Sequence, residues 1–227
     1  MKKLLIMLIV FGFCLNANAL TVMEFLATKD EIQTVNKIGF KLLNDNRIPH
    51  RMTFSIAKNK HANAATKRIN NEIVVTDTLI KTSDSLDEIA AVIAHEIAHG
   101  VDNRQGAFNG AFSFLGNAFN PKKYEYKSDK IAVDYLVKSG YNPLALITIL
   151  NKISAQYRFD WNSTHPLTSR RMAEIYEYIY VKYPQYLVQN EFRENIYYQN
   201  FLLTSKENRG KLQKKIESNS KRKVKYL

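Results

Sequence analysis

The stretch that decides the fold of this chain runs from Ile89-Ala90-Ala91-Val92-Ile93-Ala94 into His95-Glu96-Ile97-Ala98-His99. Its residues are apolar on nearly every side of a helix, and a helix of that kind is buried. His95 and His99 are four positions apart, so their imidazoles lie on one face, about 6 Å apart along the axis, and can reach one metal ion. Imidazoles inside an apolar helix cost several kcal/mol unless they are paired or metal-bound. The stretch therefore predicts a buried helix with a metal site, and histidines with satisfied hydrogen bonds in the core are the alternative.

Glu96 is the candidate catalytic residue of this helix. It lies about 100° round the helix from His95, so its carboxylate is expected beside the metal and not on it. Two imidazoles at this spacing suit zinc, and a carboxylate in this place can act as general base for a water that the metal activates. The pattern indicates zinc-dependent hydrolysis of peptide bonds.

A catalytic zinc ion keeps three protein ligands and one open position, so a third ligand must come from elsewhere in the chain. We predict Glu125, because residues 124–136 have the apolar spacing of a helix on which Glu125 and Asp129 share one face. Asp129 is then placed to accept the second N–H of a ligating imidazole and fix its direction. The alternative is that both are solvated acids on a lysine-rich helix.

The motifs around these residues occur in the order of a known family. They are HEIAHG with the preceding Asp87 to Ala94, Glu125-x-x-x-Asp129, Ser139-Gly140-Tyr141-Asn142-Pro143, and Thr164-His165-Pro166 up to Met172. On these motifs, between about Ala62 and Tyr180, the chain resembles the HtpX-like and CAAX-prenyl-protease-type zinc metallopeptidases, gluzincins with an HExxH…ExxxD pattern. The resemblance implies an α+β, mainly helical, zincin-like domain with a small edge sheet and one zinc ion per chain.

The resemblance also implies a role for each site residue. His95, His99 and Glu125 would be the zinc ligands, Glu96 the base, and Asp129 the partner of a ligand. His165 and Arg171 would lie at the active site, where either could stabilise an oxyanion. His165 could also occupy the open metal position in a resting state. Without the family, His165 would be interpreted as a loop histidine and Arg171 as a surface residue.

The chain departs from the family pattern at three positions. Lys127 and Ser128 stand where an acidic or Gln residue and Ala are common, and Leu167 replaces a second proline. We expect none of these residues to touch a proposed ligand. The membrane-spanning helices of the integral-membrane members are not found, so we expect a compact, soluble-core member.

The amino-terminal residues have the three parts of a secretory signal peptide. Met1-Lys2-Lys3 is basic, Leu4 to Phe13 is apolar but too short to span a bilayer, and Ala17-Asn18-Ala19 predicts cleavage after Ala19. Cys14 lies in the removed part, and we favour a free mature protein over the alternative of a lipid anchor. The protein is expected to be exported to the periplasm, with secretion as the alternative.

The remaining pattern predicts a metallopeptidase domain at 20–183 and a helical, basic extension at 184–227. Helices are expected at 30–45, after a capping box at Ser85 to Glu88, from Asn142-Pro143 to Gln156, and from Pro166 to about Val181. Strands are expected at 51–56 and 72–76, with an edge strand after Asn63-Ala64 that could pair with an extended substrate. The Phe-rich segment 106–121 is either a mobile lid over the cleft or a loop whose phenylalanines fill the core.

The chain has 33 Lys and Arg residues against 21 Asp and Glu residues, a net charge of +12. Many of these bases lie beyond Lys206, and we expect this tail to be frayed. It could contact anionic lipid reversibly, with a merely solvated end as the alternative. No motif that reads bases is found, so we expect no nucleic-acid partner.

Three functions are compatible with these observations. The first is an exported zinc endopeptidase that cuts misfolded or unassembled envelope proteins, with extended or unfolded polypeptide as substrate. The second is a chaperone or adaptor whose peptide cleft binds but rarely cuts. The third is a secreted effector peptidase with one dedicated target.

Overall fold

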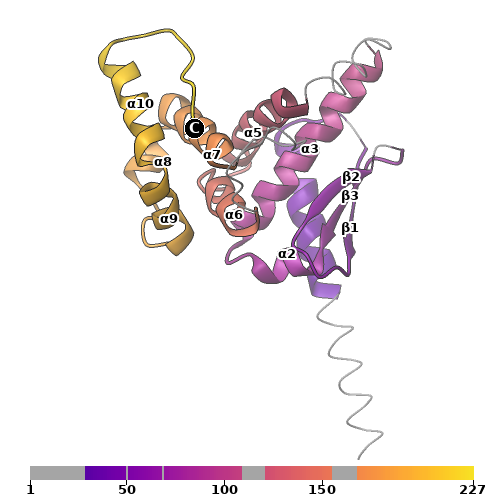
Figure 1. The fold of residues 1–227 in the computed structure, drawn as a ribbon. Coiled ribbons are helices and arrows are strands. Elements are labelled where there is room, and N and C mark those ends of the chain that lie inside the picture. Colours follow the sequence, from indigo (N-terminus) through magenta and orange to yellow (C-terminus); the bar gives the residue numbers. More distant parts are fainter. Residues whose placement is uncertain (1–28, 50, 68, 109–120, 155–167) are drawn as a thin grey trace, which may run out of the picture.

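The computed structural model describes residues 29–49, 51–67, 69–108, 121–154 and 168–227, with the backbone alone for 102–108 and 121–122. The predicted signal peptide 1–19, His165 and residues 109–120 of the Phe-rich segment lie outside the described residues. In chain order the elements are a helix over residues 29–45, β1 (Thr53–Ala57), β2 (Ala64–Lys67), β3 (Glu72–Thr76), α2 (Asp77–Thr82), α3 (Leu86–Phe108), α5 (Pro121–Lys138), α6 (Ala145–Ile153), α7 (Thr168–Lys182), α8 (Gln185–Val188), α9 (Ile196–Thr204) and α10 (Lys206–Glu217) (Figure 1). The described residues are thus mainly helical with one small sheet, as the sequence predicts.

The sheet has the strand order β1-β3-β2, with β3 parallel to β1 and antiparallel to β2. Ile73 and Val75 of the central strand β3 are fully buried, and Phe54 of β1 is buried beside them in the core. β3 has the predicted bounds, whereas β1 begins two residues later than predicted. β2 is the predicted edge strand, and it lies beside α3 (Figure 1).

The helix over residues 29–45 packs against the sheet. Its positions 35, 38, 42 and 43 are buried, as their spacing predicts, whereas Ile32 is exposed. Gly39 allows a close approach to β1, because a Cβ atom there would lie 2.4 Å from the Phe54 ring. Glycine at this position therefore lets the helix and the sheet share one core.

α3 runs between the sheet on one side and α5, α6 and α7 on the other (Figure 1). The predicted capping residue Ser85 accepts the Glu88 N–H at 3.3 Å, so the helix begins where the sequence indicates. The Glu88 carboxylate accepts the N–H of Asp84 at 2.7 Å, one residue earlier than in a standard capping box. Glu88 is fully buried and also binds Lys152 of α6 at 2.7 Å, so this cap ties two helices together.

Two predicted boundaries are wrong. α6 begins at Ala145 and not at Pro143, because residues 143–144 form a turn in which the Asn142 side chain accepts the N–H of Leu144 at 3.1 Å. α6 ends at Ile153, three residues before Gln156, where Ser154 turns to an extended conformation.

The Phe-rich segment is not a loop at its two ends, because residues 106–108 continue α3 and Pro121 begins α5.

The carboxyl-terminal part is more ordered than the sequence suggests. α10 spans Lys206–Glu217, and residues 218–227 fold back against it and α7. Tyr226 is buried and donates its hydroxyl hydrogen to Glu177 at 2.5 Å, while the backbone of Leu227 exchanges hydrogen bonds with the Asn208 side chain at 2.9 and 3.1 Å. The expectation of a frayed tail is therefore wrong. Tyr226 and the Asn208 side chain hold the end of the chain in place. Composition alone does not distinguish these residues from solvated ones.

Within the described part of the chain, every helix is too short or too polar to cross a lipid bilayer.

Candidate active site

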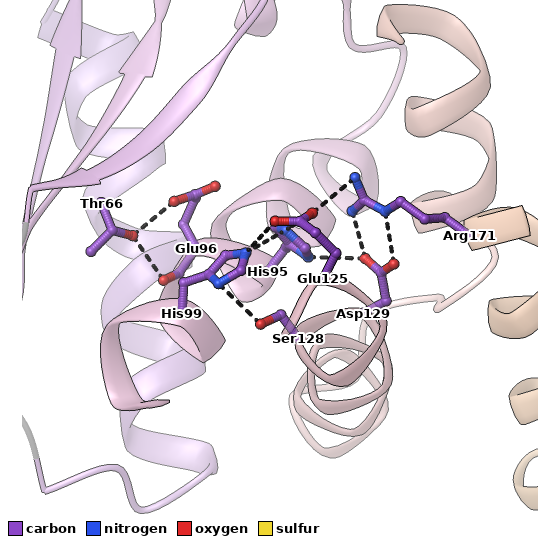
Figure 2. A network of polar contacts seen from close by, with 8 residues as sticks. All are labelled: Thr66, His95, Glu96, His99, Glu125, Ser128, Asp129 and Arg171. Atoms are coloured by element: carbon purple, nitrogen blue, oxygen red, sulfur yellow. Dashed lines mark hydrogen bonds and ion pairs between the residues drawn. The ribbon is translucent and has the colours of Figure 1, made fainter. Parts of the chain in front are cut away.

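Three predicted ligands meet where α3 faces α5 (Figure 2). His95 and His99 of α3 turn their Nε2 atoms toward each other at 3.0 Å. Glu125 of α5 places Oε1 3.2 Å from His99 Nε2 and Oε2 3.5 Å from His95 Nε2. These ligand atoms all lie within 4.8 Å of one another.

This donor set fits zinc. Ligand atoms about 2.0–2.2 Å from a tetrahedral zinc ion are about 3.3–3.5 Å apart, close to the separations found here. Two imidazole nitrogens and one carboxylate oxygen are also ligands that a catalytic zinc ion accepts, with its fourth position open. His95, His99 and Glu125 thus form a candidate metal site, and the interpretation of Glu125 as a solvated surface acid does not hold, because it is buried.

Asp129 and Arg171 complete the buried polar cluster behind the ligands. Asp129 Oδ1 lies 3.0 Å from His95 Nδ1, the nitrogen that points away from the metal site. Arg171 of α7 donates to both Asp129 oxygens at 2.9 and 2.7 Å, and its Nη1 lies 3.1 Å from Glu125 Oε2. Three elements therefore supply the cluster, since α3 gives the histidines, α5 the acids and α7 the guanidinium.

The charges of this cluster depend on one another. Burial raises the pKa of Asp129, but the Arg171 charge and hydrogen bonds outweigh burial and lower the pKa to about 2. Burial lowers the pKa of His95, yet the adjacent carboxylates of Asp129 and Glu125 raise that pKa to about 9. Without metal, therefore, a protonated His95 balances the carboxylates near neutral pH. A metal ion that binds Nε2 must displace that proton.

The sequence prediction missed the partner of the second histidine. Ser128 of α5 is fully buried, and its Oγ lies 3.1 Å from His99 Nδ1. We expected that the departures from the family pattern, Ser128 among them, would not touch a ligand, and for Ser128 this is wrong. Helical spacing offered one signal, because Ser128 lies three residues after Glu125 and so shares a face of the helix with that candidate ligand.

Glu96 is held by a residue of the edge strand. The Thr66 hydroxyl of β2 lies 2.8 Å from Glu96 Oε2 and 2.9 Å from the Glu96 carbonyl oxygen (Figure 2). The strand beside the site is thus connected to the candidate base. The sequence did not predict Thr66 as a site residue. The alternation of β2 indicates only that Thr66 and Ala64 lie on the same side of the strand.

Two further predicted residues have different outcomes. Arg171 is buried in the site, so its interpretation as a surface residue does not hold. Its nitrogens contact the carboxylates of Asp129 and Glu125. Its predicted action on an oxyanion stays a prediction. His165 lies outside the described residues, and its roles stay predictions too.

Comparison with known proteins agrees with this geometry. The chain matches Peptidase family M48 over residues 29–107 and 105–179, more than half of its length. It is 24% identical over 183 residues to the "Beta-barrel assembly-enhancing protease" of Escherichia coli (strain K12) and over 190 residues to that of Yersinia pestis. Each alignment covers 63% of this chain and 37% of the relative, so the chain spans well under half of their length. The match over more than half of the chain, which includes every residue of the candidate metal site, shows that this chain belongs to Peptidase family M48.

Proposed function

We propose that this protein is an exported zinc-dependent endopeptidase that cuts extended polypeptides in the cell envelope. The observation that carries the proposal is the convergence of His95, His99 and Glu125 within 4.8 Å, with Glu96 on the same helix as the two histidines. A donor set that fits zinc, next to a carboxylate that is not a ligand, is the arrangement that metal-assisted hydrolysis requires.

In the proposed reaction each residue has a separate task. His95, His99 and Glu125 hold the zinc ion, which when bound lowers the pKa of water and polarises a carbonyl oxygen. Glu96 accepts the proton of the attacking water and then delivers it to the amine that leaves. Thr66 holds one oxygen of Glu96 at 2.8 Å, which leaves the other oxygen for that proton.

Extended polypeptide is the proposed substrate class because β2 is an edge strand. Its outer edge is not paired with another described strand, and Thr66 connects it to the site. A substrate that pairs with such an edge gains affinity from main-chain hydrogen bonds and little selectivity for sequence. This suits unfolded or unassembled proteins as substrates.

The proposed location in the envelope has two supports. The sequence of residues 1–19 has the pattern of a secretory signal peptide. The relatives from Escherichia coli and Yersinia pestis are named for the enhancement of β-barrel assembly. We propose the periplasm as the compartment and the quality control of envelope proteins as the role.

Reversible contact with anionic membrane is proposed for the carboxyl-terminal tail. Residues 205–227 contain nine Lys and Arg residues and two Glu residues. Several of the bases are exposed, namely Lys206, Lys214, Lys221, Arg222 and Lys225. Clustered basic side chains attract an anionic surface, with a strength that falls as salt rises. Binding to anionic vesicles that is equal in low and high salt would contradict this proposal.

The proposed function is tested by the zinc content and casein cleavage of the mature protein and its Glu96→Gln variant. Both proteins should bind one zinc ion, and only the wild type should cut. Glu72→Gln, which removes a carboxylate from β3, is a control that should cut like the wild type. Equal turnover by the Glu96→Gln protein would refute the role of Glu96. Zinc in both proteins without cleavage by either would instead favour a module that binds peptides or an enzyme with one dedicated target.

A further inference from the structure

Two consecutive residues of α5 each contact one of the candidate zinc-binding histidines. Asp129 Oδ1 lies 3.0 Å from His95 Nδ1, and Ser128 Oγ lies 3.1 Å from His99 Nδ1. Figure 2 shows both contacts on the side of the rings that faces away from their meeting Nε2 atoms. The two imidazoles are therefore both held at the nitrogen that does not face the metal site, but by different chemical groups.

A zinc ion on Nε2 would fix the hydrogen of His99. An imidazole that binds zinc through Nε2 is neutral and carries its hydrogen on Nδ1. In that state Nδ1–H of His99 donates to Ser128 Oγ, 3.1 Å away. Ser128 is 0% exposed, so water does not compete for this contact.

The two contacts differ in kind. Asp129 is a carboxylate whose two oxygens accept from Arg171. Ser128 offers a neutral hydroxyl oxygen, and its contact with His99 Nδ1 has hydrogen-bond geometry.

We propose that Ser128 is a positioning residue that fixes the ring direction of His99 and so sets the zinc affinity of the site. The proposal rests on the proposed zinc site. The residue acts on the protein's hold on zinc and does not touch the substrate.

The test compares the zinc affinity of wild type, Ser128→Ala and Ser128→Thr, measured by competition with a chromophoric chelator on metal-free protein. Partners of ligating histidines change metal affinity by about 10- to 100-fold, and for this neutral contact we expect a loss near the lower end, about 10-fold, in Ser128→Ala. Ser128→Thr, which restores the hydroxyl, should regain part of that loss.

A matched control separates this role from the loss of any buried hydroxyl. Ser139 begins the turn directly after α5, is 2% exposed and accepts from Asn46 at 3.1 Å, and it lies 11 residues after Ser128 in the chain. Ser139→Ala should leave zinc affinity unchanged. A second readout is the Nδ1–H proton resonance of His99 in the zinc-loaded protein, which should move upfield in Ser128→Ala because the acceptor of this hydrogen is lost.

The outcomes distinguish the proposal from the function on which it rests. Zinc affinity of Ser128→Ala equal to that of the wild type would overturn the role of Ser128 alone. A wild-type protein that binds no zinc would overturn the proposed function and this proposal with it. A wild type that binds zinc but does not cut would overturn the peptidase function, while a selective loss of affinity in Ser128→Ala would still support the role of Ser128.

Discussion

Arg171 donates hydrogen bonds to both carboxylate oxygens of Asp129, from Nε at 2.9 Å and from Nη2 at 2.7 Å, although the two residues are 42 positions apart in the chain. The same guanidinium reaches Glu125 through Nη1 at 3.1 Å. The Arg171 guanidinium thus holds two acids in place, the candidate ligand Glu125 and Asp129, which contacts His95. Two carboxylates and one guanidinium leave one negative charge, which favours a cation at the histidines.

Loss of the Arg171 side chain should destabilise the protein strongly. Arg171→Met leaves two buried carboxylates without their cation, and breaking a buried pair in this way costs about 3–5 kcal/mol. Arg171→Lys should recover little, because an ammonium group cannot donate to both oxygens in the same plane. Urea unfolding of the metal-free protein measures the effect. The control is Lys182→Met, which removes an exposed partner of Asp134 and should cost no more than about 1 kcal/mol. Equal stability of Arg171→Met and wild type would show that the cluster does not need the guanidinium.

Asp129→Asn should weaken zinc binding by about 10- to 100-fold, because the amide orients the His95 ring less strongly than a carboxylate does. The measurement is a zinc titration against a competing chelator. Asp134→Asn changes another acid of α5, which accepts from Tyr178 and Tyr183 and lies outside the ligand cluster. This control should bind zinc like the wild type. If both variants lose affinity equally, the effect belongs to the helix and not to the contact with His95.

Thr66→Val should lower kcat and leave zinc affinity unchanged. Valine keeps the shape and strand preference of threonine, but it removes the hydroxyl that donates to Glu96 at 2.8 Å. A hydrogen bond to a charged group is worth about 1.5–3 kcal/mol, so we expect a loss in kcat of about 10-fold or more. Thr66→Ser retains the hydroxyl and should retain most of the activity. A Thr66→Val enzyme with normal kcat and raised KM would instead indicate that Thr66 acts only in substrate binding.

The stability of the metal-free protein should fall as pH rises from about 6.5 to about 9. The pKa of His95 is raised from 6.5 to about 9 in the folded state, so the folded protein binds this proton more tightly than the unfolded chain does. Its contribution is complete below the unfolded pKa and is lost as pH rises through the folded value. The Asp129 pKa of about 2 lies far below this window, so that carboxylate stays ionised throughout. Urea midpoints in the presence of a chelator measure the fall.

His95→Gln is the control for this pH dependence. The variant lacks the titrating ring, so the fall between about pH 6.5 and 9 should disappear. A wild-type midpoint that stays level across the window would contradict the assignment.

Lys152→Met should destabilise the protein more than the double variant Glu88→Gln with Lys152→Met. Lys152 binds Glu88 at 2.7 Å, and the two side chains are 3% and 0% exposed. The single change leaves a buried carboxylate unpaired, at a cost of about 3–5 kcal/mol, whereas the double change removes that charge as well. Urea unfolding of the wild type, the two single variants Lys152→Met and Glu88→Gln, and the double variant tests this. Additive losses would mean that the pair is not coupled.

Local sequence determined which segments form helices and strands and which side chains share a face. The apolar spacing around His95 and His99, the cap at Ser85 and the bounds of β3 depend on neighbours only a few residues away, so they could be predicted. Glu125 and Asp129 could be placed on one helical face for the same reason. The motif order then indicated that this face meets His95 and His99.

Tertiary packing alone decided the contacts between elements. Ser128 meets His99 and Thr66 meets Glu96 only because α5 and β2 pack at a particular height along α3, and Arg171 meets Asp129 only because α7 packs against α5. Periodicity shows which face of α5 carries Ser128, but it does not encode that height. The end of the chain follows the same rule, since Tyr226 donates to Glu177 of α7. Sequence determined the chemical groups of this site because helical geometry is local, whereas the fold determined which group orients which, because hydrogen bonds require atoms to meet within about 3 Å.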